Sequence, residues 1–323
     1  MDGFGKRYMV NTDHTDMTRG FVTVATGRKE YYKLASNLLA SYKYHTAKPM
    51  RWAILCDEEN EYTRQFDDVV LPQRVTRTVW DKFLPLENVP YDEYIYIDAD
   101  CLAYRDLNGL WDIFRDASYF SYLGALLPLD SRDGWFDPSH LGEFSDRVDY
   151  QITMQGGIMF FRNGPELDAF AAMCHHIYEH IFDYNFRLLS DETIYALASA
   201  YYGLKPAKNW TDVFCFLPEA ETIDVDILRG KLKFRWKRFA NWRPIYGKYL
   251  VHWTTEGSRG DLYRREAAAL EPVAAQGRHA PFAVRLRIKA VSLRCYLTEH
   301  LTPAVPESLK EIIVRFWSKL HKQ

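Results

Sequence analysis

The sequence predicts an α/β domain with a largely parallel central sheet. Short, β-branched apolar segments alternate with segments of helical periodicity, which is typical of sheets whose strands are joined by helices. The 323 residues are 47% hydrophobic, which suffices for a sizeable buried core in one large domain or two ordinary ones. The net charge of -2 gives the chain as a whole no polyanion-binding signature.

The expected elements follow one another closely along the chain. Residues 21–26 form the first expected strand, which ends before Gly27, and a helix with one apolar face follows over 30–45. Further strands are expected at 51–56, 68–71, 93–99, 119–127, 157–161 and 249–255, and further helices at 166–182 and 190–202. Residues 128–151 are rich in Pro, Gly, Asp and Ser, and a loop of that length inside a compact domain is usually functional.

The two ends of the chain differ from its middle. Residues 1–20 are polar and lack the apolar core of a secretory signal, and the five cysteines are scattered without a Cys-x-x-Cys pair. Both features predict a cytosol-like compartment with reduced thiols. Residues 261–323 are expected to be helical, and 282–323 carry eight Lys or Arg against three Glu. Such a basic amphipathic segment either lies peripherally on an anionic membrane surface or packs onto the main domain.

Two aspartates mark the end of the strongest predicted strand. Asp98 and Asp100 sit one residue apart where the apolar run of 93–99 ends. In an extended segment both side chains point to one side, and ligands of parallel sheets bind beyond the carboxyl ends of the strands. Neighbouring carboxylates repel each other, and a divalent cation such as Mg²⁺ or Mn²⁺ removes the conflict. The alternative interpretation is that Asp98 caps the turn that follows.

The stretch YIYIDADCLAYRDLNGLW, at 94–111, resembles the Asp-x-Asp region of glycosyltransferase family 8. The similarity in motif order extends over roughly 21–260. It implies a GT-A fold, a single nucleotide-binding α/β domain, with 1–20 as an extension and 261–323 as a helical tail. By this resemblance Asp98 binds the metal and lies near the donor ribose, while Asp100 is the principal metal ligand.

The resemblance also assigns residues to the donor. Lys82 stands where the family places a basic residue near the donor, although it could be a solvated lysine beside Trp80. Thr26 and Tyr31 follow the first strand, where the family contacts uracil, and Tyr31 resembles its stacking aromatic. Tyr32 competes for that role.

Three further segments match family motifs around the sugar. In QGGIMFF, Gln155 takes the place of the family's asparagine. Gly156 and Gly157 would let the donor approach the backbone closely; the alternative interpretation is that the two glycines only form a turn or bulge. Asp191 resembles an aspartate near the transferred sugar, although it would also suit a helix N-cap. His252 resembles the histidine that completes the metal shell, its alternative being a satisfied histidine at a strand end.

The chain departs from the family pattern at two places. After the histidine, the family's usual Gly and Lys are replaced by Thr255 and Ser258, and Arg259 is the nearby basic residue that could bind the donor instead. The family's Asp-Gln pair is Asp191-Glu192 here, which adds an acid next to the expected sugar site.

The resemblance therefore implies a retaining, Mn²⁺-dependent (or Mg²⁺-dependent) hexosyltransferase that uses a nucleotide-sugar, with a UDP-sugar expected, and a glycan or glycolipid acceptor. One alternative is a catalytically inactive protein of the same fold that binds nucleotide-sugar. Another is nucleic-acid binding through 229–248, which hold eight Lys or Arg and no acid, although no nucleic acid is expected. A metal-dependent phosphohydrolase is a lesser alternative.

Overall fold

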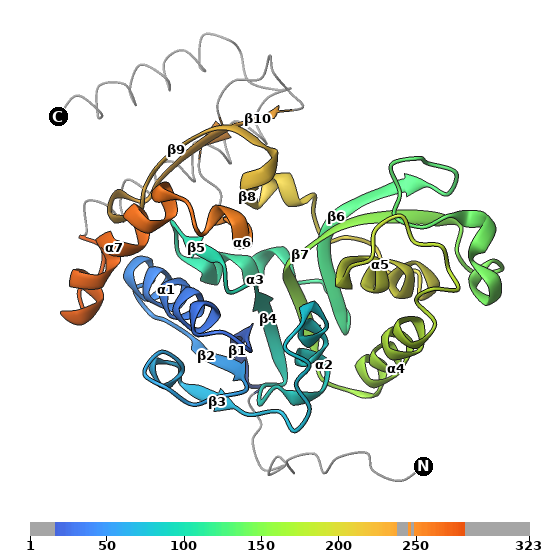
Figure 1. Ribbon diagram of the computed structural model, residues 1–323, viewed down its shortest axis with the longest axis horizontal. Coiled ribbons are helices and arrows are strands. Elements are labelled where there is room, and N and C mark those ends of the chain that lie inside the picture. The colour runs from blue at the N-terminus through green and yellow to red at the C-terminus, as the bar shows by residue number, and fades with distance from the viewer. Residues whose placement is uncertain (1–16, 238–244, 247–248, 282–323) are drawn as a thin grey trace.

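A computed structural model describes residues 17–237, 245–246 and 249–281, and its main feature is a six-stranded sheet (Figure 1). The strand order is β3-β2-β1-β4-β7-β6, and the first four of these strands are parallel. Strand β7 runs antiparallel to both of its neighbours. The strands are β1 (Arg19–Ala25), β2 (Arg51–Cys56), β3 (Asp68–Val70), β4 (Glu93–Ile97), β6 (Phe120–Pro128) and β7 (Tyr150–Arg162). The predicted, mostly parallel α/β sheet is therefore present.

Helices cover both faces of the sheet, so β4 is buried on both sides. Tyr94 and Tyr96 point into the core shared with α4 and α5, whereas Ile95 and Ile97 point into the core shared with α1 and α3. This explains why the sequence of β4 is apolar at successive positions rather than alternating. The helices are α1 (Lys29–His45), α2 (Pro85–Asn88), α3 (Leu110–Ile113), α4 (Pro165–Glu179), α5 (Asp191–Tyr201), α6 (Thr254–Gly257) and α7 (Asp261–Ala275).

Two smaller three-stranded sheets complete the described part. One has the order β5-β12-β8, with β5 (Cys101–Ala103), β12 (Leu250–His252) and β8 (Phe214–Phe216); the other has β11-β10-β9, with β9 (Ala220–Asp226), β10 (Lys231–Trp236) and β11 (Ile245–Tyr246). Residue His252 pairs with Cys101 across the antiparallel β12–β5 ladder. This pairing brings the histidine next to the aspartates that precede β5.

The structure corrects some predicted boundaries. Strand β7 begins at Tyr150 rather than at residue 157, and the predicted loop 128–151 buries Phe136, Leu141 and Phe144 in the core, so much of it is packed rather than free. The strand expected at 249–255 is limited to β12, because the chain turns into α6 at Thr254. Strands β5 and β8–β11 were not predicted, being short or half-exposed.

The beginning of the predicted C-terminal tail packs on the domain. Helix α7 buries Tyr263 and Leu270 in a core shared with β5, β10 and β12. The basic segment 282–323 and residues 1–16 lie outside the described residues. Among the helices that are described, none combines the length and apolarity that a membrane-spanning helix needs. The four described cysteines are buried and free.

Candidate active site

The two aspartates lie where β4 ends, and the backbone around them is fixed by neighbouring strands. The Asp98 amide donates to the carbonyl oxygen of Gly157 (3.0 Å), and the Trp253 amide donates to the carbonyl oxygen of Asp100 (3.1 Å). The Asp98 carboxylate accepts from the Tyr96 hydroxyl at 2.5 Å. Lys82 and His252 also approach this carboxylate, and no hydrogen bond joins it to an amide of the following turn among the described residues, so the turn-capping interpretation is wrong.

Lys82 lies between two carboxylates. Its Nζ is 3.0 Å from Asp98 Oδ2 and 3.5 Å from Asp191 Oδ2, and both carboxylates are buried. Burial disfavours the charged amine, but Asp191 and Asp98 together raise the pKa of Lys82 well above its usual value. Lys82 is consequently a fixed positive charge, and the interpretation of a solvated lysine is wrong.

His252 lies on the other side of the aspartates. Its Nε2 is 3.1 Å from Asp100 Oδ1 and 3.4 Å from Asp98 Oδ2. Burial opposes protonation of the imidazole, yet Asp100 and Asp98 raise the pKa of His252; burial likewise opposes ionisation of Asp100, yet His252 lowers its pKa. The two carboxylates thus attract positive charge to this point. Two carboxylates and an imidazole form a ligand set that suits Mn²⁺, and the carboxylates also suit Mg²⁺.

Cys101 is a neighbour of this site that the sequence did not suggest. One potential ligand atom from each of Asp100, Cys101 and His252 lies within 4.8 Å of the others. Burial, with the charges of Asp100 and Asp98, raises the pKa of the Cys101 thiol well above its usual value. Metals bind the thiolate rather than the thiol, so Asp98 suits the third ligand position better than Cys101.

The glycine pair lies at an irregularity in β7, between the metal-ligand candidates and α5. Tyr122 pairs with Met159, but the next residue of β6, Leu123, pairs with Gln155, so the register shifts across the glycines. A Cβ at Gly157 would lie 2.8 Å from His252 Nδ1, and one at Gly156 would lie 3.0 Å from Asp191 Oδ2. A side chain at Gly157 would force His252 to move, and one at Gly156 would press tightly on Asp191, so the bulge and close-approach interpretations describe the same feature.

The start of α5 supplies two acids. Ser190 is the N-cap, accepting from the Thr193 amide, so the N-cap interpretation of Asp191 is wrong. Glu192 Oε1 accepts from the Gly156 amide at 2.7 Å. Burial and the neighbouring Asp191 raise the pKa of Glu192 to about 7, and burial also raises the pKa of Asp191. Glu192 was noted as a departure from the family but was not predicted to be a site residue.

Gln155 occupies β7 immediately before the glycines. Its Oε1 is buried and has no hydrogen-bond partner among the described residues. A buried amide oxygen without a partner is costly. A ligand that reached this oxygen would supply the missing hydrogen bond.

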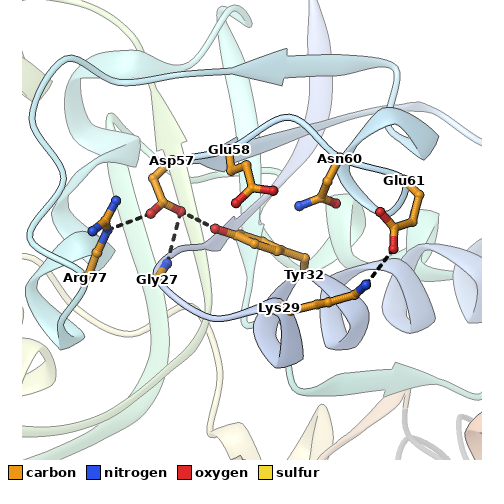
Figure 2. Close-up of a pocket in the computed structure, with 8 residues that line it drawn as sticks. All are labelled: Gly27, Lys29, Tyr32, Asp57, Glu58, Asn60, Glu61 and Arg77. Atoms are coloured by element: carbon orange, nitrogen blue, oxygen red, sulfur yellow. Dashed lines mark hydrogen bonds and ion pairs between the residues drawn. The ribbon is translucent and has the colours of Figure 1, made fainter.

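Two further aspartates join the loop after β1 to residues 76–82. Asp81 Oδ2 accepts from the Thr26 hydroxyl (2.6 Å) and the Arg77 amide (2.8 Å). Asp57 accepts from the Gly27 amide, the Tyr32 hydroxyl and Arg77 Nε. Figure 2 shows Asp57 at the centre of these contacts. The hydroxyl of Thr26, predicted to contact the donor, is thus engaged within the protein.

A cavity of about 330 Å³ opens beside Asp57, lined by Gly27, Lys29, Tyr32, Asp57, Glu58, Asn60, Glu61 and Arg77 (Figure 2). Tyr32, rather than Tyr31, contributes its aromatic ring to this cavity. Tyr31 packs, partly buried, between two hydrophobic cores. Arg259 forms an exposed ion pair with Glu30, at 3.0 Å, at the start of α1. The roles predicted for Tyr31 and Arg259 stay predictions.

Comparison with solved structures identifies the architecture. A crystal structure of an active-site mutant of LgtC is 12% identical in sequence, covers 78% of this chain and 95% of its own, and superposes with a TM-score of 0.51. The galactosyltransferase LgtC in complex with donor and acceptor sugar analogs covers 82% of this chain and 99% of its own, with 12% identity and a TM-score of 0.50. No protein-family model and no curated protein sequence matches the chain. The GT-A fold is confirmed, and membership of family 8 stays a prediction.

Proposed function

We propose that the chain is a retaining glycosyltransferase that moves a hexose from a nucleotide-sugar, with a UDP-sugar as the expected donor, to a glycan or glycolipid acceptor. The observation that carries the proposal is the convergence of Asp98, Asp100, His252, Lys82 and Asp191 at the end of β4. Carboxylates, a fixed ammonium and an imidazole at the carboxyl end of a central strand suit an anionic, metal-bound ligand. The GT-A fold supports the choice of donor.

The residues fit a divalent cation. Asp98, Asp100 and His252 would hold it, and the absence of a side chain at Gly157 leaves the His252 ring undisplaced. When bound, the cation would supply Lewis-acid stabilisation of the negative charge on a diphosphate leaving group. We propose Mn²⁺ as the resident ion, with Mg²⁺ as the substitute.

Side chains of the protein itself would act on the diphosphate and on the sugar of the donor. Lys82 is held as a cation by Asp98 and Asp191, and would stabilise charge that develops on the departing diphosphate. Asp191, whose Oδ2 lies 3.5 Å from Lys82 Nζ, would stabilise an oxocarbenium-like sugar centre. Gln155 Oε1, buried without a described partner, would accept a hydrogen bond from a sugar hydroxyl. Retention requires either attack on the same face as departure or a covalent intermediate.

The proposal is tested with a panel of nucleotide-sugars in Mn²⁺, reading out donor hydrolysis and thermal shift. We expect one donor to raise the melting temperature and to be hydrolysed slowly without acceptor. Asp100→Asn should abolish turnover and keep the circular dichroism spectrum. Wild-type activity in this variant would remove Asp100 from the metal site, and no shift with any nucleotide-sugar would refute the proposal.

A protein that binds nucleotide-sugar without turnover is the second candidate, because the described geometry supports binding and catalysis alike. It would show the thermal shift without hydrolysis or transfer. The nucleic-acid alternative is less favoured. Three of the five basic side chains at 229–237 pair with acids of β9: Arg229 with Asp226 (3.5 Å), Lys231 with Asp224 (2.6 Å) and Arg235 with Glu221 (2.8 Å). Part of this charge is therefore balanced locally.

A further inference from the structure

An open groove of about 550 Å³ lies at the far end of the two elements that carry the candidate active site. It is lined by Leu126, Arg147, Asp149, Tyr150, Ala200, Tyr201, Tyr202, Gly203 and Lys205. Helix α5 begins at the site with Asp191 and ends in this groove, and Figure 1 shows it alongside the β6–β7 hairpin. At a rise of about 1.5 Å per residue, the groove lies about 15 Å along α5 from Asp191.

Tyrosine side chains form one wall of the groove. Tyr202, at the end of α5, is 37% exposed, which is high for an aromatic side chain. The guanidinium of Arg147 lies 5.0 Å from the ring centroid of Tyr201 and donates to its hydroxyl at 3.0 Å. The Tyr150 and Tyr202 hydroxyls donate to backbone carbonyl oxygens of Leu204 and Ala169, both at 3.3 Å. These contacts hold amphipathic rings at the surface in fixed orientations.

Charged groups of both signs face the same groove without partners. The side chains of Asp149 and Lys205 are exposed and make no hydrogen bond or ion pair with any other residue that the structure describes. An acceptor and a donor are thus free beside the aromatic wall. With Arg147, Lys205 and Asp149 the groove lining has two cations and one carboxylate. A purely apolar ligand would leave these charged groups desolvated.

A saccharide matches this combination of groups. The apolar C–H faces of sugar rings pack on aromatic side chains, while their hydroxyls both donate and accept hydrogen bonds. Binding sites generally combine aromatic walls with a few placed polar groups in this way. We propose that the groove binds the distal sugars of an oligosaccharide acceptor whose other end reaches Asp191. This inference rests on the proposed function and specifies its acceptor as an oligosaccharide rather than a monosaccharide.

The test uses an array of defined oligosaccharides, from disaccharides to octasaccharides, probed with the full chain in the absence of donor and cation. We expect a subset of the longer glycans to bind, with apparent affinity about tenfold weaker for Tyr202→Ala and for Asp149→Ala. Tyr202→Phe keeps the ring and should retain most of the binding. Phe182→Ala removes an exposed aromatic that does not line the groove, and should bind normally.

The outcomes separate this inference from the proposed function. Asp100→Asn should still bind the same glycans, because Asp100 does not line the groove. If wild type shows a nucleotide-sugar thermal shift but no array binding, the groove proposal is refuted and the transferase proposal stands. Equal binding by wild type, Tyr202→Ala and Asp149→Ala would also refute it, since the glycans would then bind elsewhere.

Discussion

Replacing Gly157 with alanine tests whether the close contact between β7 and His252 matters for the proposed metal site. The added Cβ would lie 2.8 Å from His252 Nδ1, 3.2 Å from Cε1 and 3.5 Å from Asp98 Oδ2. A separation below 3.0 Å requires movement, and His252 is buried between fixed neighbours. Overpacking of this kind costs about 1–3 kcal/mol of folding free energy. A displacement approaching 1 Å at a catalytic group can lower turnover by about 100-fold.

The assay measures donor hydrolysis across a Mn²⁺ titration, with unfolding in urea measured in parallel. We expect the Gly157→Ala protein to be folded, to need more Mn²⁺ and to turn over about 100-fold more slowly. Gly109→Ala is the matched control, because its Cβ would lie 2.7 Å from the Tyr249 ring, away from the ligand candidates. It should lose similar stability and keep its Mn²⁺ dependence. Unchanged turnover and titration in Gly157→Ala would refute the assigned geometry.

Three further predictions concern ionisable side chains that are buried or partly buried. Asp81→Asn removes a charge-assisted acceptor from the contact with Thr26, so the donor KM should rise about tenfold with kcat nearly unchanged; an unchanged KM would contradict this. Burial lowers the pKa of His45 to about 3, so only the unfolded chain gains a proton below about pH 6.5. The unfolding free energy should therefore fall by about 2 kcal/mol from pH 7 to pH 5 through this residue. In urea melts at several pH values, His45→Gln should show a smaller decrease in unfolding free energy between pH 7 and pH 5. Lys82→Gln leaves the Asp98 and Asp191 carboxylates without their ammonium and should cost about 3 kcal/mol in cation-free urea melts; a loss below about 1 kcal/mol would contradict it.

The elements that sequence alone predicted best are those with strong periodicity and burial. Strand β2 has the predicted bounds, and β4 was evident because both faces of the strand are buried. Strands β5 and β8 have three residues each and are formed by pairing with β12, which no local pattern indicates. The first half of β7, YQITMQ, alternates apolar and polar residues as strands do, so the sequence carried a signal for it that the prediction of a strand at 157–161 did not use.

The same distinction applies to the candidate site. Asp98 and Asp100 follow an apolar strand and were found from that position, whereas the contact of Lys82 with both Asp98 and Asp191 depends on tertiary packing. Asp57 follows β2 directly, so the rule that identified Asp98 could have identified it as well. Asp81 lies within a short 3-10 helix, and nothing in its sequence neighbourhood indicates its contacts with Thr26 and Arg77.

The 13-residue length of β7 has an evolutionary consequence. The middle of the strand, at Gly156 and Gly157, is constrained by close contacts to Asp191 and His252, while its first residue, Tyr150, borders an open groove. Under the proposed function, mutations near Tyr150 can accumulate without altering the candidate site, because Tyr150 and Gly156 lie six positions apart along β7. A lineage could thus acquire new acceptor preferences by changing the tip of one hairpin while inheriting an unaltered catalytic apparatus.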